Sequence, residues 1–586
     1  MNAPSDEPRG AAEGRVGGAA APARGPFLGG WYPLAAIVLL AASIGLWAPD
    51  EPRYAEVARE AWDGDLLVMH LNGDVYFAKP PLVYWLAGAF GRCFGWHELA
   101  LRLPSLLATL ATAWLAARLA RRYWGELEAR WTVFFALGSA MVFYIGGRLQ
   151  LDPVLSALCL AAVERATVEE GTRAERGRAR LVGGLCAGLA ALAKGPVAWL
   201  HVGVGVIALH LARERARDAA APRKGSWFAF ALLALVPVVA WGLAASFAEH
   251  ARTGTWDLFR SLFFGQHFGR VIEGTEHRGP PWEFLKTFPP LFLPFTPFLL
   301  VGLVRAWRVR RALGTRASVE SARLELVRGE RALVGFALAF TVLFVAFSAM
   351  PPKRDLYLLP LYPAAALLCA RVVAETLRGA PLARGFGRAS ALVWTLVGAA
   401  GLVGLVAVLG VVRIEALDAL ARKPDAEDVL EVVRANVPGV AAVFGAFLLG
   451  GAAALVAFAR RRVAFGLDAL GVGITVAVAA AALFVLPPID PLKCARGLAE
   501  ELAARPEKPT RIACVGVQPE GYRFYGRVPA VKEDLEVALA REGDQFLALV
   551  ARKNFELLPE TLRARLCVLA SRSVGSRDVL VLGAAR

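Results

Sequence analysis

Residues 391–412 read ALVWTLVGAAGLVGLVAVLGVV, an uninterrupted apolar run that contains no charged side chain. About 20 consecutive apolar residues suffice for an α-helix to cross the hydrocarbon core of a bilayer. This run therefore predicts a transmembrane helix. Similar runs recur along the chain, and we count thirteen candidate spans. They lie near residues 31–47, 99–120, 131–147, 153–167, 181–193, 197–211, 227–247, 284–304, 332–350, 356–370, 391–412, 440–459 and 465–486.

The overall composition agrees with a membrane protein. The 586 residues are 56% hydrophobic and only 20% charged, and the mean hydropathy is +0.48. Soluble domains usually carry about 25% charged residues. The composition therefore excludes a disordered chain and argues against a set of water-soluble domains.

The positive charge of the chain is distributed in a way that predicts its topology. The net charge of +16 comes from 66 basic and 50 acidic residues. The arginines gather in the N-terminal tail and in the loops after the second, fourth, sixth, eighth, tenth and twelfth candidate spans. Basic residues concentrate in cytoplasmic loops of membrane proteins. The pattern therefore predicts a cytoplasmic N-terminus, an extracytoplasmic C-terminus and no nucleic-acid partner, because the arginines are dispersed over loops without a reading motif.

The chain divides into three predicted parts. Residues 1–28 are rich in Gly, Ala, Pro and Arg and predict a disordered cytoplasmic tail. Residues 29–487 form the predicted transmembrane domain, which includes a long first extracytoplasmic loop at residues 48–98. We interpret the first apolar run as a retained anchor rather than a cleaved signal peptide. Residues 488–586 contain RIACVGV, QFLALVA, LCVLA and DVLVLGA, which predict strands of a small extracytoplasmic α/β domain.

The extracytoplasmic loops carry charges of both signs next to the membrane. Three of the ten lysines, Lys79, Lys194 and Lys353, fall there, as do Asp50 and Asp152. Each residue alone has an ordinary explanation, because lysines snorkel toward headgroups and an Asp before Pro caps a helix. Snorkelling and capping do not predict acids and cations together in several separate loops at one face. Such a set suits chemistry on a phosphate ester, in which cations hold the phosphate and a carboxylate assists the reaction.

Five motifs carry a resemblance to a known family. They are DEPRYAEVARE (50–60), YFAKPPLVYWL (76–86), RLQLD (148–152), LAKGPVA (192–198) and PPKRDLYLLPLYPA (351–364). In this order they resemble the bacterial aminoarabinose transferases, which group with the protein O-mannosyltransferases among integral-membrane glycosyltransferases of the GT-C fold. The resemblance extends from about Trp31 to Leu368. It implies an α-helical polytopic membrane enzyme with a GT-C-like fold.

The resemblance also implies an activity and its site. Enzymes of this family transfer a sugar, a hexose or pentose, from a polyprenyl-phosphate carrier such as undecaprenyl phosphate to an acceptor at the periplasmic face of the bacterial inner membrane. The acceptor class includes lipid A, other glycans and proteins. By this resemblance the catalytic acids are Asp50, Glu51 and Asp152. The implied substrate-binding residues are Arg53, Tyr76, Lys79, Lys194, Arg270 and Tyr357. Lys353 and Arg354 join this predicted set because they lie in the same charged outer loop as Tyr357.

The acceptor decides the expected role of Asp50. A hydroxyl acceptor needs a general base, whereas a phosphate acceptor needs no proton removed and leaves Asp50 to orient groups or bind a divalent metal ion. Family members often have Glu before the lysine of the KPP motif, but this chain has Ala78. The remaining candidate metal ligands near the site are His70, His97 and His267.

Two other classes of function fit part of the pattern. A transporter or flippase for a lipid-linked or anionic substrate would also have many spans, but transporters usually place charges near the bilayer midplane and contain an internal repeat. A sensor or assembly scaffold would leave the acids and cations of the first loop unexplained. The sequence therefore favours the transferase.

Overall fold

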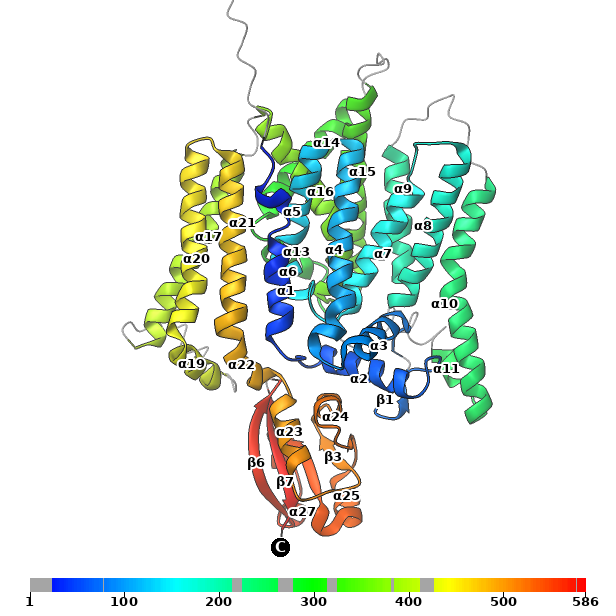
Figure 1. The fold of residues 1–586 in the computed structure, drawn as a ribbon, viewed down its shortest axis with the longest axis vertical. Coiled ribbons are helices and arrows are strands. Elements are labelled where there is room, and N and C mark those ends of the chain that lie inside the picture. The colour runs from blue at the N-terminus through cyan, green and yellow to red at the C-terminus, as the bar shows by residue number, and fades with distance from the viewer. Residues whose placement is uncertain are drawn as a thin grey trace, which may run out of the picture.

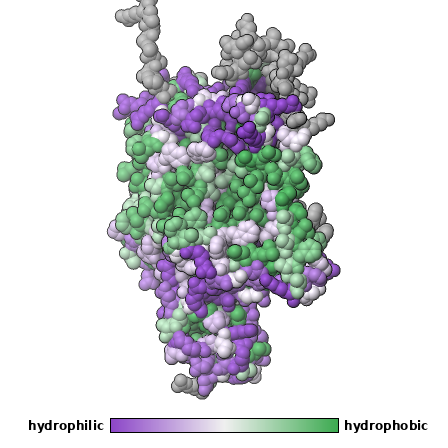
Figure 2. Space-filling model, turned by 45° about the vertical axis from the view of Figure 1, so that its right-hand side comes forward, coloured by the Kyte–Doolittle hydropathy of each residue, from purple (hydrophilic) through white to green (hydrophobic). Residues whose placement is uncertain are grey.

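The computed structural model describes residues 24–76, 78–212, 224–261, 278–313, 324–380, 384–410, 426–575 and 577–585. The chain forms a bundle of upright helices with a small domain attached to one end (Figure 1). On the face seen in Figure 2, a broad apolar belt crosses the bundle and separates two polar rims. We call the rim that carries the small domain the outer face and the opposite rim the inner face.

Most of the bundle consists of α-helices that lie between these two rims. They are α1 (Pro33–Ser43), α4 (Glu98–Tyr123), α5 (Glu126–Leu137), α6 (Ala140–Ile145), α7 (Leu151–Ala166), α8 (Arg173–Lys194), α9 (Val197–Ala212), α10 (Lys224–Thr253), α13 (Glu283–Leu291), α14 (Thr296–Leu313), α15 (Leu324–Ala349), α16 (Tyr362–Leu377), α17 (Arg384–Val408), α20 (Val437–Ala459) and α21 (Val463–Ala480). Shorter elements join them or lie at the rims. These are η1 (Phe27–Gly30), α2 (Asp50–Asp63), β1 (His70–Leu71), β2 (Asp74–Val75), α3 (Leu82–Phe94), α11 (Asp257–Arg260), η4 (Asp355–Leu361), α19 (Ala426–Ala435), η5 (Ala481–Val485) and α22 (Leu486–Lys493).

Seven helical segments of the described chain are long and apolar enough to cross a membrane, or eight if the bent pair α13 and α14 is one span. The other five predicted spans coincide with α1, α5 and α6, α7, α8 and α9. These helices are too short or too charged to count as membrane spans by length and hydropathy. For example, α1 has 11 residues, and α8 begins with several arginines. The predicted fold class, a helical polytopic membrane protein, is confirmed, whereas thirteen crossings stay a prediction.

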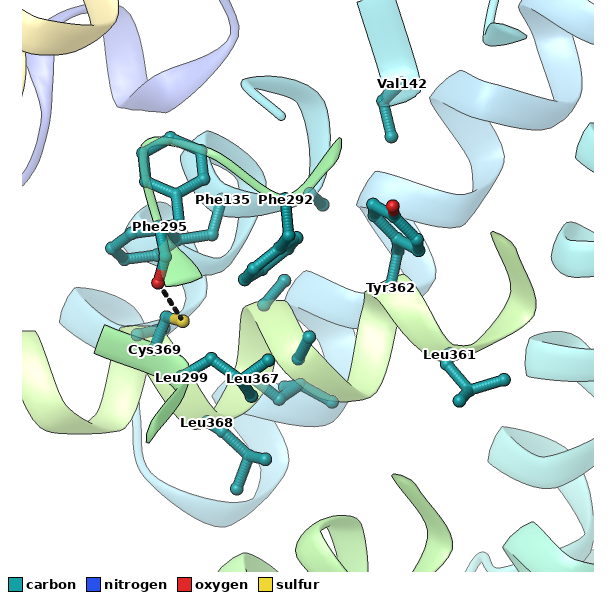
Figure 3. Close-up of a cluster of buried hydrophobic side chains, with 14 of the residues drawn as sticks. Phe135, Val142, Phe292, Phe295, Leu299, Leu361, Tyr362, Leu367, Leu368 and Cys369 are labelled. Carbon is teal, nitrogen blue, oxygen red and sulfur yellow. Dashed lines mark hydrogen bonds between the residues drawn. The ribbon is translucent and has the colours of Figure 1, made fainter. Parts of the chain in front are cut away.

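An aromatic cluster holds the bend between α13 and α14 in the interior (Figure 3). The ring of Phe295 lies 4.7 Å from that of Phe135 on α5, and the ring of Phe292 lies 5.4 Å from that of Tyr362 on α16. The Sγ of Cys369 also contacts the carbonyl of Phe295 at 3.8 Å. Edge-on aromatic pairs of this kind add to the free energy of burial. The bend therefore packs against α16, which directly follows η4 of the outer face.

Buried ion pairs join helix ends at the inner face. Glu128 of α5 accepts hydrogen bonds from Arg371 of α16 at 2.9 Å and from Arg378, which directly follows α16, at 2.5 Å. Glu164 of α7 pairs with Arg122 of α4. The ends that follow the second, fourth and tenth predicted spans thus lie together. This is the arrangement that the alternating arginine-rich loops predict.

The C-terminal domain contains a five-stranded mixed sheet and several helices, which confirms the predicted small α/β domain. Its strand order is β4-β3-β5-β7-β6, with β3 parallel to β4 and β5, and with β7 antiparallel to β5 and β6. Its elements are α23 (Arg496–Ala504), β3 (Ile512–Val515), α24 (Glu520–Gly526), β4 (Ala530–Val531), α25 (Leu535–Glu542), η6 (Gly543–Gln545), β5 (Leu547–Ala551), α26 (Arg552–Glu556), α27 (Glu560–Arg563), β6 (Leu566–Val574) and β7 (Arg577–Ala584). The four predicted strand motifs coincide with β3, β5, β6 and β7.

Polar contacts attach this domain to the outer end of the bundle. The hydroxyl of Tyr525 accepts a hydrogen bond from the Leu46 amide at 2.8 Å and donates one to Glu98 at 2.6 Å. Asp490 of α22 accepts a hydrogen bond from the Gly45 amide at 2.8 Å. The domain therefore lies against the chain segment that enters the first outer loop.

Candidate active site

The first turn of α2 places the key acids of the outer loop. The helix begins at Asp50, and Pro52 lies in its first turn, where a missing amide hydrogen costs no helical hydrogen bond. Acidic residues in this turn also complement the positive end of the helix dipole. Because α-helical residues three and four apart share a face, Asp50, Arg53 and Tyr54 face one way.

The Asp50 carboxylate is held between two arginines from distant parts of the chain. Its Oδ1 lies 3.2 Å from Arg53 and its Oδ2 lies 2.5 Å from Arg354, in the segment before η4. Asp50 is only 6% exposed, whereas about a third of each arginine side chain is exposed, 30% and 31%. Burial opposes the charge of Arg354, but Asp50 outweighs it and raises the pKa of Arg354. The site thus presents two fixed cations.

A second acid–cation pair lies on neighbouring helices. Asp152, in the first turn of α7, is buried and pairs with Lys194, the last residue of α8. Gly195 ends α8 with φ of +90°, a conformation that favours glycine, and Pro196 follows it immediately before α9. The Lys194 ammonium also lies 4.8 Å from the centre of the Tyr357 ring. The LAKGP motif therefore fixes the position of Lys194.

Three tyrosines fill the space beside these pairs. The Tyr84 ring lies 5.8 Å from that of Tyr54 and 6.1 Å from that of Tyr76. Burial raises the pKa of the Tyr76 phenol and outweighs the opposing charge of Arg53. Burial, reinforced by the charge of Asp50, also raises the pKa of Tyr54, and Asp152 acts in the same direction. Both phenols therefore stay protonated at neutral pH, and Tyr54 lies within the field of both acids.

A short hairpin leads to the lysine of the KPP motif. Asn72 and Gly73, with φ of +61° and +90°, form the two-residue turn between β1 and β2. The Glu60 carboxylate of α2 accepts hydrogen bonds from both amides, at 2.8 and 3.1 Å. Tyr76 follows β2 directly, and Lys79 is half-buried in the turn before α3. The hairpin thus ties the Tyr76–Lys79 segment to α2.

Glu51 and Lys353 have contacts that differ from their predicted roles. Glu51 is buried and accepts hydrogen bonds from Arg102 at 2.7 and 2.8 Å and from the Leu149 amide at 2.9 Å. Burial disfavours its charge, but Arg102 outweighs burial and lowers the pKa of Glu51. The Lys353 ammonium instead donates to the carbonyls of the last turns of α15, including that of Ser348 at 2.9 Å. Both contacts are structural, so we assign neither residue to the reacting groups.

Arg270 and His267 lie outside the described residues. The described residues contain no group of three His, Cys, Asp or Glu side chains placed to hold a metal ion. The His97 ring accepts a hydrogen bond from the Ala100 amide at 3.4 Å and caps α4, and His70 lies in β1. These residues do not form a metal centre by themselves, so a bound metal stays a prediction and we derive no step through it.

Several site residues were not predicted from the sequence. Tyr54 follows Asp50 by four residues, so its place on the same helical face was open to prediction from the helix period. Arg102 lies inside α4 and outside every quoted motif, whereas Tyr84 lies within the motif at residues 76–86 but was not singled out. Their roles come from contacts between separate helices, which spacing along one chain does not reveal.

The fold defined by these elements is that of a known membrane protein. The crystal structure of ArnT from Cupriavidus metallidurans in the apo state matches with a TM-score of 0.69 at 22% identity, over 94% of this chain and 97% of that one. The structure of the same protein bound to undecaprenyl phosphate also matches with a TM-score of 0.69, at 21% identity and over the same shares of the two chains. The chain therefore has the ArnT fold.

Sequence comparisons point in the same direction. Residues 78–241 match the family described as dolichyl-phosphate-mannose-protein mannosyltransferase. The undecaprenyl phosphate-alpha-4-amino-4-deoxy-L-arabinose arabinosyl transferase of Edwardsiella ictaluri is 30% identical over 360 residues, 59% of this chain and 60% of that protein. The Pseudomonas aeruginosa PAO1 protein of the same name is 30% identical over 346 residues, 57% of each chain. The matched region thus spans less than two thirds of these relatives. The resemblance stated from the motifs is confirmed.

Proposed function

We propose that the protein is a glycosyltransferase whose active site lies at the outer, periplasmic face of the membrane. It moves a pentose, 4-amino-4-deoxy-L-arabinose, from undecaprenyl phosphate to a phosphorylated lipid acceptor such as lipid A. The names of the two sequence relatives support the sugar and its carrier. The solved complex of the Cupriavidus protein with undecaprenyl phosphate supports a carrier site in this fold. The proposed place is the bacterial inner membrane, with the N-terminus cytoplasmic and the site periplasmic.

The observation that carries this proposal is the pair of fixed arginines at Asp50. In the reaction, the bond between the anomeric carbon and the carrier phosphate oxygen breaks, and a new bond to the acceptor oxygen forms. Negative charge grows on the departing phosphate, and prepositioned cations stabilise it most effectively. Arg53 and Arg354 are held in place by Asp50 and remain partly exposed. We assign them, with Lys79 and Tyr76, to the carrier phosphate.

The contacts of Asp50 favour an acceptor that needs no deprotonation. Each carboxylate oxygen already accepts a hydrogen bond from a guanidinium. A carboxylate engaged in this way is suited to orienting the arginines, whereas a general base needs an oxygen within reach of the acceptor proton. A phosphate acceptor reacts as an anion and needs no such base. We therefore assign Asp50 to orienting Arg53 and Arg354.

The second pair serves the sugar and the acceptor side of the reaction. Asp152 fixes the Lys194 ammonium, and the Tyr357 ring covers it. A buried carboxylate beside an amino sugar favours a cationic or hydroxyl-bearing ring over an apolar one. We assign Asp152 and Lys194 to positioning the sugar between carrier and acceptor, while Glu51 only supports the turn.

The test uses purified protein in lipid nanodiscs with radiolabelled sugar on undecaprenyl phosphate and lipid A as acceptor. We expect label in lipid A with the aminoarabinose donor and much less with a mannose donor. Transfer of mannose alone would overturn the proposed sugar. The transporter alternative predicts uptake of a soluble anion into proteoliposomes without any glycolipid, and that result would overturn the transferase.

A further inference from the structure

Arg148, in the turn between α6 and α7, is a buried cation that forms no ion pair with an acid of the described residues. It is 7% exposed, and its Nε has no hydrogen-bond partner among the described residues. Its guanidinium lies between two aromatic rings, 4.7 Å from the centre of the Trp47 ring and 4.5 Å from that of Tyr144. Removing a cation from water is costly unless an anion compensates it.

The neighbouring acids are already engaged elsewhere. Glu51 lies close enough to influence Arg148, but its oxygens accept from Arg102, from the Leu149 amide and from the Trp47 amide. Asp490 accepts from the Trp47 indole at 2.6 Å and from the Gly45 amide. Within the described parts of the chain, neither acid is hydrogen-bonded to Arg148. Glu51 and Arg102 cancel each other in charge, which leaves the positive charge of Arg148.

The position of Arg148 indicates the kind of anion. Arg148 follows the predicted span at residues 131–147, and Trp47 ends the span at residues 31–47, so both lie at the outer edge of the apolar belt. Tyr144 is 52% exposed, and Trp and Tyr are the side chains that favour the level of lipid headgroups. Arginine stacked on aromatic rings retains its hydrogen-bond donors in the plane of the guanidinium, where a phosphate binds them in pairs.

The first turn of α2 separates Arg148 from the residues assigned to the carrier phosphate. Asp50 and Glu51 are consecutive residues of α2, and they face different partners, Arg53 and Arg354 for Asp50 and Arg102 for Glu51. Arg148 lies on the Glu51 side. A phosphate at Arg148 would therefore not compete with a carrier phosphate at Arg53 and Arg354, as two substrates that bind together require.

We propose that Arg148, between Trp47 and Tyr144, is a binding site for the phosphate of a lipid headgroup, and that this lipid is the acceptor. The second half of the proposal rests on the proposed function. The first half does not, because lipid binding is measurable without any transfer.

The binding test uses native mass spectrometry of the detergent-solubilised full-length protein with phosphatidic acid or phosphatidylcholine. We expect the wild-type protein to retain one phosphatidic acid that Arg148→Gln and Tyr144→Leu lose, and that Arg148→Lys retains in part. Arg118→Gln is the matched control, because Arg118 also stacks on a tryptophan, at 4.8 Å, but is ion-paired to Glu164 at 3.3 Å. Equal retention by the wild-type protein and Arg148→Gln, or no retention by either, would overturn the site. Displacement by millimolar inorganic phosphate would overturn its assignment to a lipid.

The kinetic test separates acceptor from bulk lipid. With lipid A as acceptor, Arg148→Gln should raise the acceptor KM about tenfold and leave the donor KM and kcat unchanged, since one charge-assisted contact is lost. Lipid A without phosphates should accept no sugar from either protein, because the proposed acceptor group is the phosphate. An unchanged acceptor KM in a variant that has lost phosphatidic acid would overturn the acceptor assignment, and absence of transfer in the wild-type protein would instead count against the proposed function.

Discussion

Buried acids paired with basic side chains occur at both the inner and the outer face of the bundle, but they have different roles at the two faces. At the inner face, Glu128 and Glu164 are fully buried, and each is surrounded by two or more arginines. At the outer face, Asp50 is also buried and held by two arginines, and these are about as exposed as Arg118 and Arg378 at the inner face. The two faces differ in what accompanies the acid. The inner acids join helix ends, whereas at the outer face Tyr54 lies within the field of both Asp50 and a second paired acid, Asp152.

The largest effect on activity should come from the outer acids. Asp50→Asn and Asp152→Asn remove the charges that hold Arg354 and Lys194, and we expect transfer to fall about 10²-fold or more with the fold intact. The measurement is the initial rate of lipid A labelling by purified protein. Asp63→Asn, at the exposed end of α2, is the matched control and should keep full activity. Near-normal rates in both site variants would remove the distinction between the two faces.

The inner face should respond in stability instead. Glu128→Gln leaves Arg371 and Arg378 without their shared buried carboxylate, and we expect a loss of about 3 kcal/mol in the free energy of unfolding. Thermal unfolding in detergent measures this as a lower midpoint temperature. The rate per folded molecule should not change. A selective loss of kcat with an unchanged midpoint would contradict the assignment of Glu128 to structure.

Lys194 and Lys353 both lie at the outer face, and their variants test whether a site residue and a structural residue of that face can be told apart. Lys194 pairs with Asp152, whereas Lys353 caps the end of α15. Lys194→Met should therefore lower kcat about tenfold, and Lys353→Met should lower the unfolding midpoint slightly without changing kcat. The two variants are compared in the same transfer and melting assays. The reverse pattern would mean that Lys353 belongs to the site.

A smaller effect is expected from Glu60, which lies at the outer face but has a structural contact. Glu60→Ala removes the acceptor for the Asn72 and Gly73 amides and should loosen the segment that carries Tyr76 and Lys79. We expect the donor KM to rise about threefold to tenfold with little change in kcat, the size expected for one or two hydrogen bonds. Asp74→Ala, exposed in the same hairpin, is the control. An equal rise in both variants would show that Glu60 has no special role.

The sequence predicted the elements better than their partners. Helical segments, the strands of the C-terminal domain and the outer position of Asp50, Asp152 and Lys194 follow from apolar runs, alternation and arginine placement. The pairing of Asp50 with Arg354, which lie about 300 residues apart in the sequence, depends on how α2 packs beside η4. The capping role of Lys353 likewise depends on where α15 ends. Such contacts arise from tertiary packing, which period and spacing do not encode.

The most direct test of the account is single-turnover transfer from radiolabelled undecaprenyl-phosphate aminoarabinose to lipid A, measured side by side for the wild-type protein, Asp50→Asn and Glu128→Gln. Each rate is divided by the fraction of folded protein. We predict wild-type rates for Glu128→Gln and a loss of about 10²-fold or more for Asp50→Asn. Equal rates for Asp50→Asn and the wild-type protein would contradict the claim that the outer face holds the transferase site.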